Sequence, residues 1–154
     1  MNDNSSDSAR LLSSSVVEER LEAVRLLYGL SPVRMDLFCT AFGDQDWRVR
    51  KEAVRIFLNL PEAHQFTADI IALLYDPENA GLRNSSIEIL VSLGSFVVPE
   101  LTEIITCPDP EVRKFAIDIL GEIGGAGCEE GVLNALSDND INVRYAAVET
   151  LGKL

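Results

Sequence analysis

The chain has 154 residues, 47% of them hydrophobic and 6% aromatic, so it is long enough for one domain with a sizeable core. It carries 25 acidic and 13 basic residues, a formal net charge of -12, which opposes binding to phosphate backbones and anionic lipid headgroups. No apolar run is long enough for a membrane-spanning helix. We therefore expect a soluble protein that binds neither nucleic acid nor membrane.

Residues 1–12 begin with MNDNSSDS, which has neither a basic start nor an apolar run. This composition predicts a disordered tail and a short lead-in, not a signal peptide. The three cysteines, Cys39, Cys107 and Cys128, are odd in number and lack CxxC spacing, so we expect no disulfide framework, no metal site and no cofactor. A reducing compartment, and hence a cytoplasmic location, fits this usage.

From residue 13 onward an arginine recurs at steps of 30, 33, 30 and 31 residues. A small residue stands three places after each arginine, an aliphatic residue four places after, and Leu or Phe seven places after. These offsets mark one apolar face of an α-helix, so each arginine is expected to lie on a helix that buries one side. The arginine column consists of Arg20, Arg50, Arg83, Arg113 and Arg144.

Polar and glycine residues predict where these helices begin and end. Asp46, Asn79, Asp109 and Asp140 each lie four residues before an arginine, where a side-chain oxygen can accept a free helix N–H. Gly94 and Gly124 follow the last apolar positions, as C-terminal caps do. Second, less regular helices are expected over 32–42, 62–75, 96–106 and 128–137. Pro32 is expected to open the first of them, and Pro99 to begin or bend the third.

Each unit is thus a helical hairpin of about thirty residues, too small to bury its own apolar stripes, so neighbouring hairpins must stack. The pattern D-x-x-VR-x-x-A-x-x-x-LG-x-(I/L)G resembles HEAT-like repeats, specifically the short class named after phycobilisome linker-lyases. DPEVRKFAIDILGEIG at 109–124 matches it most fully. The expected fold is an all-α, α-α superhelix, a HEAT/armadillo-like solenoid of about five hairpin repeats with the last incomplete. Residues 13–154 form this domain, with units near 13–43, 44–75, 76–106, 107–137 and 138–154.

The arginine column has two interpretations: a row of cations for an acidic ligand, or structural bridges between loops. An acid lies six residues upstream of Arg50 and Arg144, and seven upstream of Arg83. In HEAT-like families such Arg and Asp residues typically bridge adjacent loops, so the resemblance favours the structural role. Cys107 stands at the equivalent place before Arg113, and this predicts that Arg113 bonds backbone carbonyls instead.

The second helices carry acids near the same level in successive units. Because these helices line the concave surface of HEAT-like solenoids, the resemblance implies an acidic ladder that receives a basic segment or helix of another protein. The alternative is that acids in a first helical turn simply favour the positive end of the helix dipole. The ladder residues are Asp36, Asp69, Glu100, Glu103, Glu129 and Glu130.

The remaining candidate residues give weaker signals. His64, the single histidine, is expected to be a surface residue, and no Ser, His and acid set predicts catalysis. Cys128 opens a helix beside two glutamates, which oppose activation of its thiol. Trp47 either covers the end of its hairpin or, with the basic residues Arg48, Lys51 and Arg55, marks a contact on the convex side.

The sequence therefore predicts a non-enzymatic scaffold or adaptor that binds another protein. One alternative is a phycobilin lyase-like or chaperone-type HEAT-repeat protein acting on a partner protein. Another is DNA binding, as in HEAT-like glycosylases, which the net charge opposes. Val148, Leu151 and Leu154 of the last helix would stay uncovered on one side, so we expect either a continuation of the chain or packing against another copy.

Overall fold

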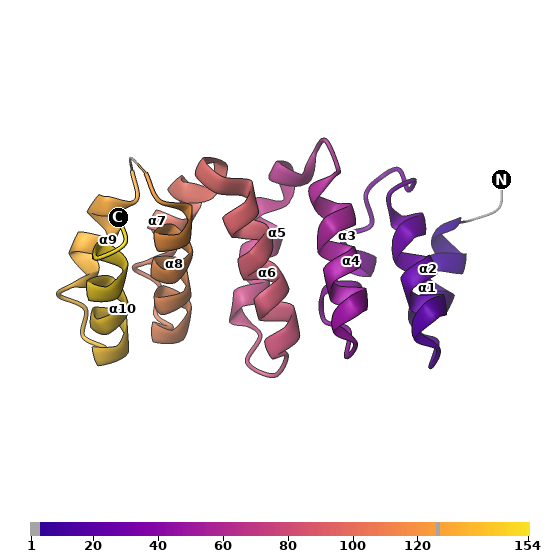
Figure 1. Ribbon diagram of the computed structural model, residues 1–154, viewed down its shortest axis with the longest axis horizontal. Helices are drawn as coiled ribbons and strands as arrows, with labels where there is room; N and C mark the ends of the chain where they lie inside the picture. The colour runs from indigo at the N-terminus through magenta and orange to yellow at the C-terminus, as the bar shows by residue number, and fades with distance from the viewer. Residues whose placement is uncertain (1–3, 126) are drawn as a thin grey trace. The chain divides into compact units, whose positions relative to one another are not determined.

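A computed structural model describes residues 4–125 and 127–154, and in these residues every regular element is helical (Figure 1). The chain divides into two compact units, Met1–Ile89 and Leu90–Leu154. No helix of the described part is long and apolar enough to cross a membrane. Unit 1 contains α1 (Asn4–Leu12), α2 (Val17–Leu27), α3 (Met35–Phe42), α4 (Trp47–Leu58), α5 (Thr67–Ala72) and, up to Ile89, α6 (Ala80–Leu93). Unit 2 contains α7 (Val98–Ile104), α8 (Pro110–Ile123), α9 (Glu129–Ala135) and α10 (Ile141–Leu151).

The arginine-bearing helices begin where their caps predict. The side chains of Asp46, Asp109 and Asp140 accept hydrogen bonds from the backbone N–H two residues later, at 2.8–2.9 Å. Asn79 accepts from the Leu82 N–H at 2.9 Å. The first repeat lacks such a residue, and Val16 precedes α2 without a side-chain cap.

In unit 1 the helical hairpins pack through the apolar columns found in the sequence. α2 packs on α4, α3 packs on α4, and α1 covers α2. Ala23 and Ala53, three places after their arginines, are fully buried, because small residues let the helices approach. Phe38, Phe42 and Phe57 fill the core, with ring centroids 5.4–5.7 Å apart. Such tilted and edge-on pairs each add about 0.5–1.5 kcal/mol to the burial of the rings.

In unit 2 the same columns build an aliphatic core. α8 lies beside α10, and each is joined to a shorter second helix, α7 or α9 (Figure 1). Ile117, Ile119 and Leu120 of α8 are fully buried, as is Leu101 of α7. A Cβ added at Gly121 would lie 2.7 Å from Cγ2 of Thr150, so this glycine lets α10 approach α8 closely.

Three segments differ from the sequence-based expectation. The expected disordered tail is helical from Asn4 onward, because α1 buries Ser8 and Leu12 against its neighbours, while residues 1–3 lie outside the described residues. Pro32 does not open a helix, since α3 begins at Met35. The second helix expected over 62–75 is divided into a 3-10 helix, α5 and a second 3-10 helix (Ala63–Phe66, Thr67–Ala72, Leu73–Tyr75).

Two other expectations at helix ends are confirmed. Pro99 lies in the first turn of α7, where its missing N–H leaves no helix carbonyl unpaired. Gly124 is the C-cap of α8 and has a φ of 66°, which a residue with a Cβ rarely adopts.

Candidate protein-binding surface

Two arginines of the column form closely similar bridges to the loop of the following repeat. Arg20 donates from Nε and from one terminal nitrogen to the Asp44 carboxylate, at 2.7 and 3.0 Å. Arg113 donates in the same way to Asp138, at 2.8 and 2.7 Å. Each aspartate also accepts the backbone N–H two residues later, at 2.8 Å. The four side chains are almost fully buried, so these charges hold neighbouring loops together.

Three arginines of the column also donate hydrogen bonds to backbone carbonyls in the loop that precedes their own helix. Arg20 donates to the Ser14 carbonyl at 2.9 Å, and Arg144 donates to the Asp138 carbonyl at 2.8 Å. Arg113 donates to the carbonyls of Cys107 and Pro108 at 2.9 and 3.1 Å. The expectation that Arg113 bonds carbonyls instead of an acid was therefore only half right. The acid that binds Arg113 is Asp138 of the next repeat. The position of Cys107 before Arg113 gave no information about this partner.

The spacing of the acid differs between the repeats that form a bridge and the one that does not. Asp44 and Asp138 lie six residues before Arg50 and Arg144, whereas Asp76 lies seven before Arg83. Asp76 accepts the N–H groups of Glu78 and Asn79 at 2.8 and 3.0 Å. Within the described residues, the guanidinium of Arg50 in the preceding repeat donates to the carbonyls of Asp44 and Gln45 and to no carboxylate. Arg83 is half-buried. The extra loop residue thus coincides with the loss of one bridge.

The hydrogen bonds within the bridges shift the pKa values of their members, and burial opposes these shifts. The hydrogen bonds from Arg113 lower the pKa of Asp138 below its ordinary value, and Asp138 raises the pKa of Arg113. Asp44 raises the pKa of Arg20 in the same manner. Both arginines therefore stay charged and engaged inside the protein, and neither offers its charge to an external acidic ligand.

The acidic residues of the second helices lie at the surface, but they are not equivalent. Asp36 is bound by Arg34, whose guanidinium lies 2.6 and 2.8 Å from its carboxylate oxygens and lowers its pKa. The other five form no ion pair within the described part of the chain, and all are exposed. These five are Asp69 in unit 1 and Glu100, Glu103, Glu129 and Glu130 in unit 2.

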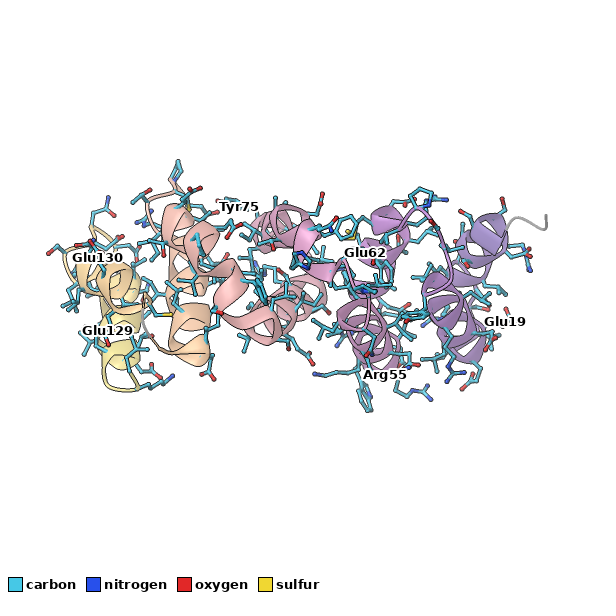
Figure 2. The ribbon with its side chains drawn as sticks, turned by 90° about the horizontal axis from the view of Figure 1, so that it is seen from above. Glu19, Arg55, Glu62, Tyr75, Glu129 and Glu130 are labelled. Atoms are coloured by element: carbon cyan, nitrogen blue, oxygen red, sulfur yellow. The ribbon has the colours of Figure 1, made fainter. Side chains whose placement is uncertain are left out.

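The four glutamates of unit 2 lie on two helices that touch. A Cβ added at Gly131 of α9 would lie 2.8 Å from Cδ1 of Ile105 and 3.6 Å from Cγ2 of Thr102, next to Glu103. The absence of a side chain at Gly131 therefore lets α9 lie against α7. Glu129 and Glu130 project from this start of α9 (Figure 2). We name Glu100, Glu103, Glu129 and Glu130 the α7–α9 acidic surface.

Two exposed leucines extend this surface along α9. Leu133 and Leu136 are exposed. Leu133 lies four residues after Glu129 and three after Glu130, and Leu136 lies three residues after Leu133, spacings that place side chains near one another on a helix. Sequence analysis missed both leucines, because period alone does not distinguish an exposed from a buried apolar residue. Gly131 inside a predicted helix was the available signal for the close approach to α7.

The basic residues near Trp47 are neutralised by neighbours. Trp47 itself is 64% exposed, so its ring does not cover the hairpin. Arg48 lies 3.1 Å from Asp46, and Lys51 lies 2.6 Å from Glu88. Arg55, which points away from α4 in Figure 2, is held by Glu52 at 2.8 Å. These three cations are paired with acids but stay partly exposed, so a contact on the convex side stays a prediction.

The described residues offer no evident catalytic or metal centre. They contain no group of three or more His, Cys, Asp or Glu side chains placed to hold a metal ion. Burial, and next the neighbouring Glu129, raises the pKa of the Cys128 thiol, which donates to the Gly124 carbonyl at 3.4 Å. His64 is exposed, as expected. A hollow of about 420 Å³ in unit 2 is lined by Cys107, Arg113, Asn134 and Asp138, among others, and the bridge already uses two of these.

Comparison with protein-family models matches residues 98–154 to HEAT repeats. This match supports the resemblance to HEAT-like repeat proteins that the sequence pattern indicated. The matched part of the chain contains α7–α10 and the Arg113–Asp138 bridge. The predicted fold class, an all-α protein of the α-α superhelix type, is confirmed. The narrower assignment to the phycobilisome lyase-type class stays a prediction.

Two solved structures, each described as the crystal structure of an engineered protein, are similar to this chain. The first is 23% identical, with a TM-score of 0.43, and the match covers 99% of this chain and 79% of that one. The second is 22% identical, with a TM-score of 0.41, and the match covers 95% of this chain and 46% of that one. No curated protein matches the chain.

Proposed function

We propose that the protein is a non-enzymatic interaction module and that its α7–α9 acidic surface binds a basic segment of another protein. The supporting observation is a set of four exposed carboxylates, without ion pairs in the described residues, on two helices held in contact at Gly131. A helical-repeat surface with few deep cavities suits the binding of a protein segment better than the binding of a small molecule.

The charge distribution favours a basic partner for unit 2. Residues 90–154 contain 11 acidic and 4 basic side chains. Such an excess attracts a lysine- or arginine-bearing segment and speeds its association at low ionic strength. Leu133 and Leu136 would contact apolar side chains of the same segment. The preferred ligand is therefore a basic segment with interspersed apolar residues.

The remaining residues of the predicted ladder contribute differently to this proposal. Asp69 of unit 1 is exposed without an ion pair in the described residues, and it is proposed as a separate contact of unit 1 for a basic segment. Asp36 is bound by Arg34, so a ligand would first have to displace that pair. The same chemistry disfavours nucleic acid, because the net charge of -12 repels phosphate.

A reducing, cytoplasmic location remains part of the proposal. The three cysteines are free thiols, and such cysteines persist where the compartment keeps them reduced. No feature of the described residues favours the alternative of a phycobilin lyase-like or chaperone-type protein, so we do not propose that activity.

The test compares two double charge reversals with the same change in net charge. Glu129→Lys with Glu130→Lys alters the α7–α9 acidic surface, and Glu19→Lys with Glu62→Lys alters unit 1 (Figure 2). The probe is a fluorescent peptide of alternating lysine and leucine, titrated at low and physiological salt. We expect the first variant to weaken binding at least about tenfold, a difference of about 1.4 kcal/mol, and the control far less.

Thermal melts of both variants establish that the fold is retained. Equal weakening by the two variants would mean that the peptide responds only to net charge, and the assignment of the surface would then be wrong. The same pair can serve as bait in affinity capture, where a natural partner should be lost only with the first variant.

A further inference from the structure

The guanidinium of Arg50 makes only part of the bonding that Arg20 makes. In Arg20, Nη1 donates to a loop carbonyl at 2.9 Å, while Nε and Nη2 donate to the Asp44 carboxylate at 2.7 and 3.0 Å. Nη1 of Arg50 also donates to loop carbonyls, those of Asp44 and Gln45, at 2.7 and 3.3 Å. Its Nε and Nη2 have no hydrogen-bond acceptor among the described residues. We name these two donors the Arg50 edge, and Arg113 holds a carboxylate with the same two atoms.

The acid of the following loop is used within that loop. Asp76 accepts the backbone N–H groups of Glu78 and Asn79, at 2.8 and 3.0 Å. The Arg50 side chain lies instead against the first turn of α6, where a Cβ added at Gly81 would be 3.0 Å from its Cδ and 3.1 Å from its Nε. The glycine therefore provides the space that this arginine occupies.

Arg50 also lines a hollow of about 210 Å³ between α4 and α6. Trp47 borders the same hollow and is 64% exposed, so its indole ring is accessible to an apolar side chain of a ligand. The hollow lies within unit 1. Its lining consists of Trp47, Arg50, Lys51, Asn84, Ser85 and Glu88.

The charge around the hollow favours a singly charged anion. The helix α4 carries four basic residues and one acid, and three of the four bases lie 2.6–3.1 Å from a carboxylate. The fourth base, Arg50, forms no ion pair within the described part of the chain. Glu88 lines the hollow, so its negative charge opposes a doubly charged phosphate more strongly than a single carboxylate.

We propose that the Arg50 edge and the hollow beside Trp47 bind a carboxylate side chain of another protein. The carboxylate accepts from Nε and Nη2 of Arg50, as the Asp44 carboxylate does from Arg20. An apolar residue of the same segment then packs on the indole of Trp47. A two-donor, charge-assisted bond of this kind supplies direction as well as affinity. The site is separate from the basic-segment binding proposed for unit 2 and does not depend on it.

The test uses Trp47, the single tryptophan of the chain, as the reporter of binding. A capped peptide Gly-Leu-Asp-Leu-Gly is titrated up to about 10 mM while tryptophan emission is recorded, and the control peptide has Asn in place of Asp. We expect a saturable change with the first peptide and at least about tenfold weaker binding of the second. The absence of a saturable change with the Asp peptide would overturn the proposal.

Variants of α4 then separate the Arg50 edge from general charge. Arg50→Gln and Arg50→Lys should each weaken binding of the Asp peptide at least about tenfold, because neither keeps the planar pair of donors. The matched control is Arg55→Gln, which removes one charge from the same helix and should leave binding within about twofold. Thermal melts establish that the variants stay folded. Equal weakening by Arg50→Gln and Arg55→Gln would overturn the assignment of the site.

Deletion of Glu78 tests the same edge from inside the protein. It places Asp76 six residues before the arginine of its repeat, the spacing found in the repeats that form a bridge. The new bridge should raise the melting temperature and abolish peptide binding, because Asp76 then occupies the Arg50 edge. Unchanged peptide binding in a stabilised deletion variant would overturn the proposal.

Two further outcomes would replace the proposed ligand. Inorganic phosphate that displaces the peptide better than acetate at equal ionic strength would make a phosphate group the ligand and overturn the carboxylate. A dimer of the protein alone that Arg50→Gln abolishes would make a second copy the occupant instead of another protein.

Discussion

Units 1 and 2 use the same internal bridge to hold different cores and different surfaces. Arg20–Asp44 and Arg113–Asp138 have nearly identical geometry, with four donor–acceptor distances of 2.7–3.0 Å. Around them, unit 1 packs phenylalanine rings and unit 2 packs isoleucine and leucine. The geometry of the arginine–aspartate bridge is thus the same beside an aromatic core and beside an aliphatic core.

The surfaces of the two units differ more than their frameworks do. In unit 1 most basic side chains pair with acids, such as Lys51 with Glu88 and Arg55 with Glu52. In unit 2 the glutamates of α7 and α9 form no ion pairs within the described residues. Binding specificity is therefore expected to depend on surface charges, because the repeat pattern does not determine the residues at those positions.

Breaking the bridge of unit 2 should have the largest effect on stability. Arg113→Ala leaves the buried Asp138 carboxylate without its partner, so we expect a loss of about 3–5 kcal/mol in the free energy of unfolding. Arg20→Ala should cost a similar amount if the two bridges are equivalent. Urea denaturation followed by circular dichroism measures both changes. Arg50→Ala is the control, because it removes bonds to carbonyls only and should cost less.

A core truncation in unit 2 should have the next largest effect. Leu120→Ala creates a cavity at a fully buried position, for which we expect a loss of about 2–5 kcal/mol. Leu133→Ala, at an exposed position of α9, should change stability by less than about 0.5 kcal/mol. Comparable losses for both variants in thermal or urea melts would contradict the assignment of core and surface.

Acid should weaken the bridge of unit 2 without any substitution. Asp138 has a pKa below its ordinary value in the folded protein, so its stabilising contribution is present above the pKa of an unfolded aspartate, about 3.9. That contribution is lost as the pH falls through the folded-state pKa. The difference in unfolding free energy between the protein and Asp138→Asn should therefore shrink between about pH 5 and pH 2. A constant difference over this range would argue against a charge contribution.

Adding a side-chain cap at the start of α2 should have the smallest effect on stability, and it tests whether the capped helices of the other repeats gain from their aspartates. Val16 precedes α2 in an extended conformation and makes no side-chain cap, whereas Asp109 caps α8. Val16→Ser should supply the acceptor and raise the free energy of unfolding by about 0.5–1 kcal/mol. The matched variant Asp109→Ala should lower it by about 1 kcal/mol. A loss with Val16→Ser would show that the exposed valine side chain contributes more than the cap.

The sequence by itself determined the helical period, the caps and the columns that are buried. These features are local, because an aspartate before a helix and an apolar residue every third or fourth place act within a few residues. For this reason Asp46, Asp109 and Asp140 were found at their helix starts, and Ala23, Ala53, Ala116 and Ala147 were expected and found inside. The same signals predicted the HEAT-like fold class.

Only the tertiary structure decided which distant groups meet. Arg113 binds an aspartate 25 residues away, and Arg20 binds an aspartate 24 residues away. The tertiary structure also showed that residues 4–12 fold as α1 against α2, although their polar composition suggested a tail. These outcomes depend on how separate elements approach one another, and the spacing of residues along one helix does not contain that information.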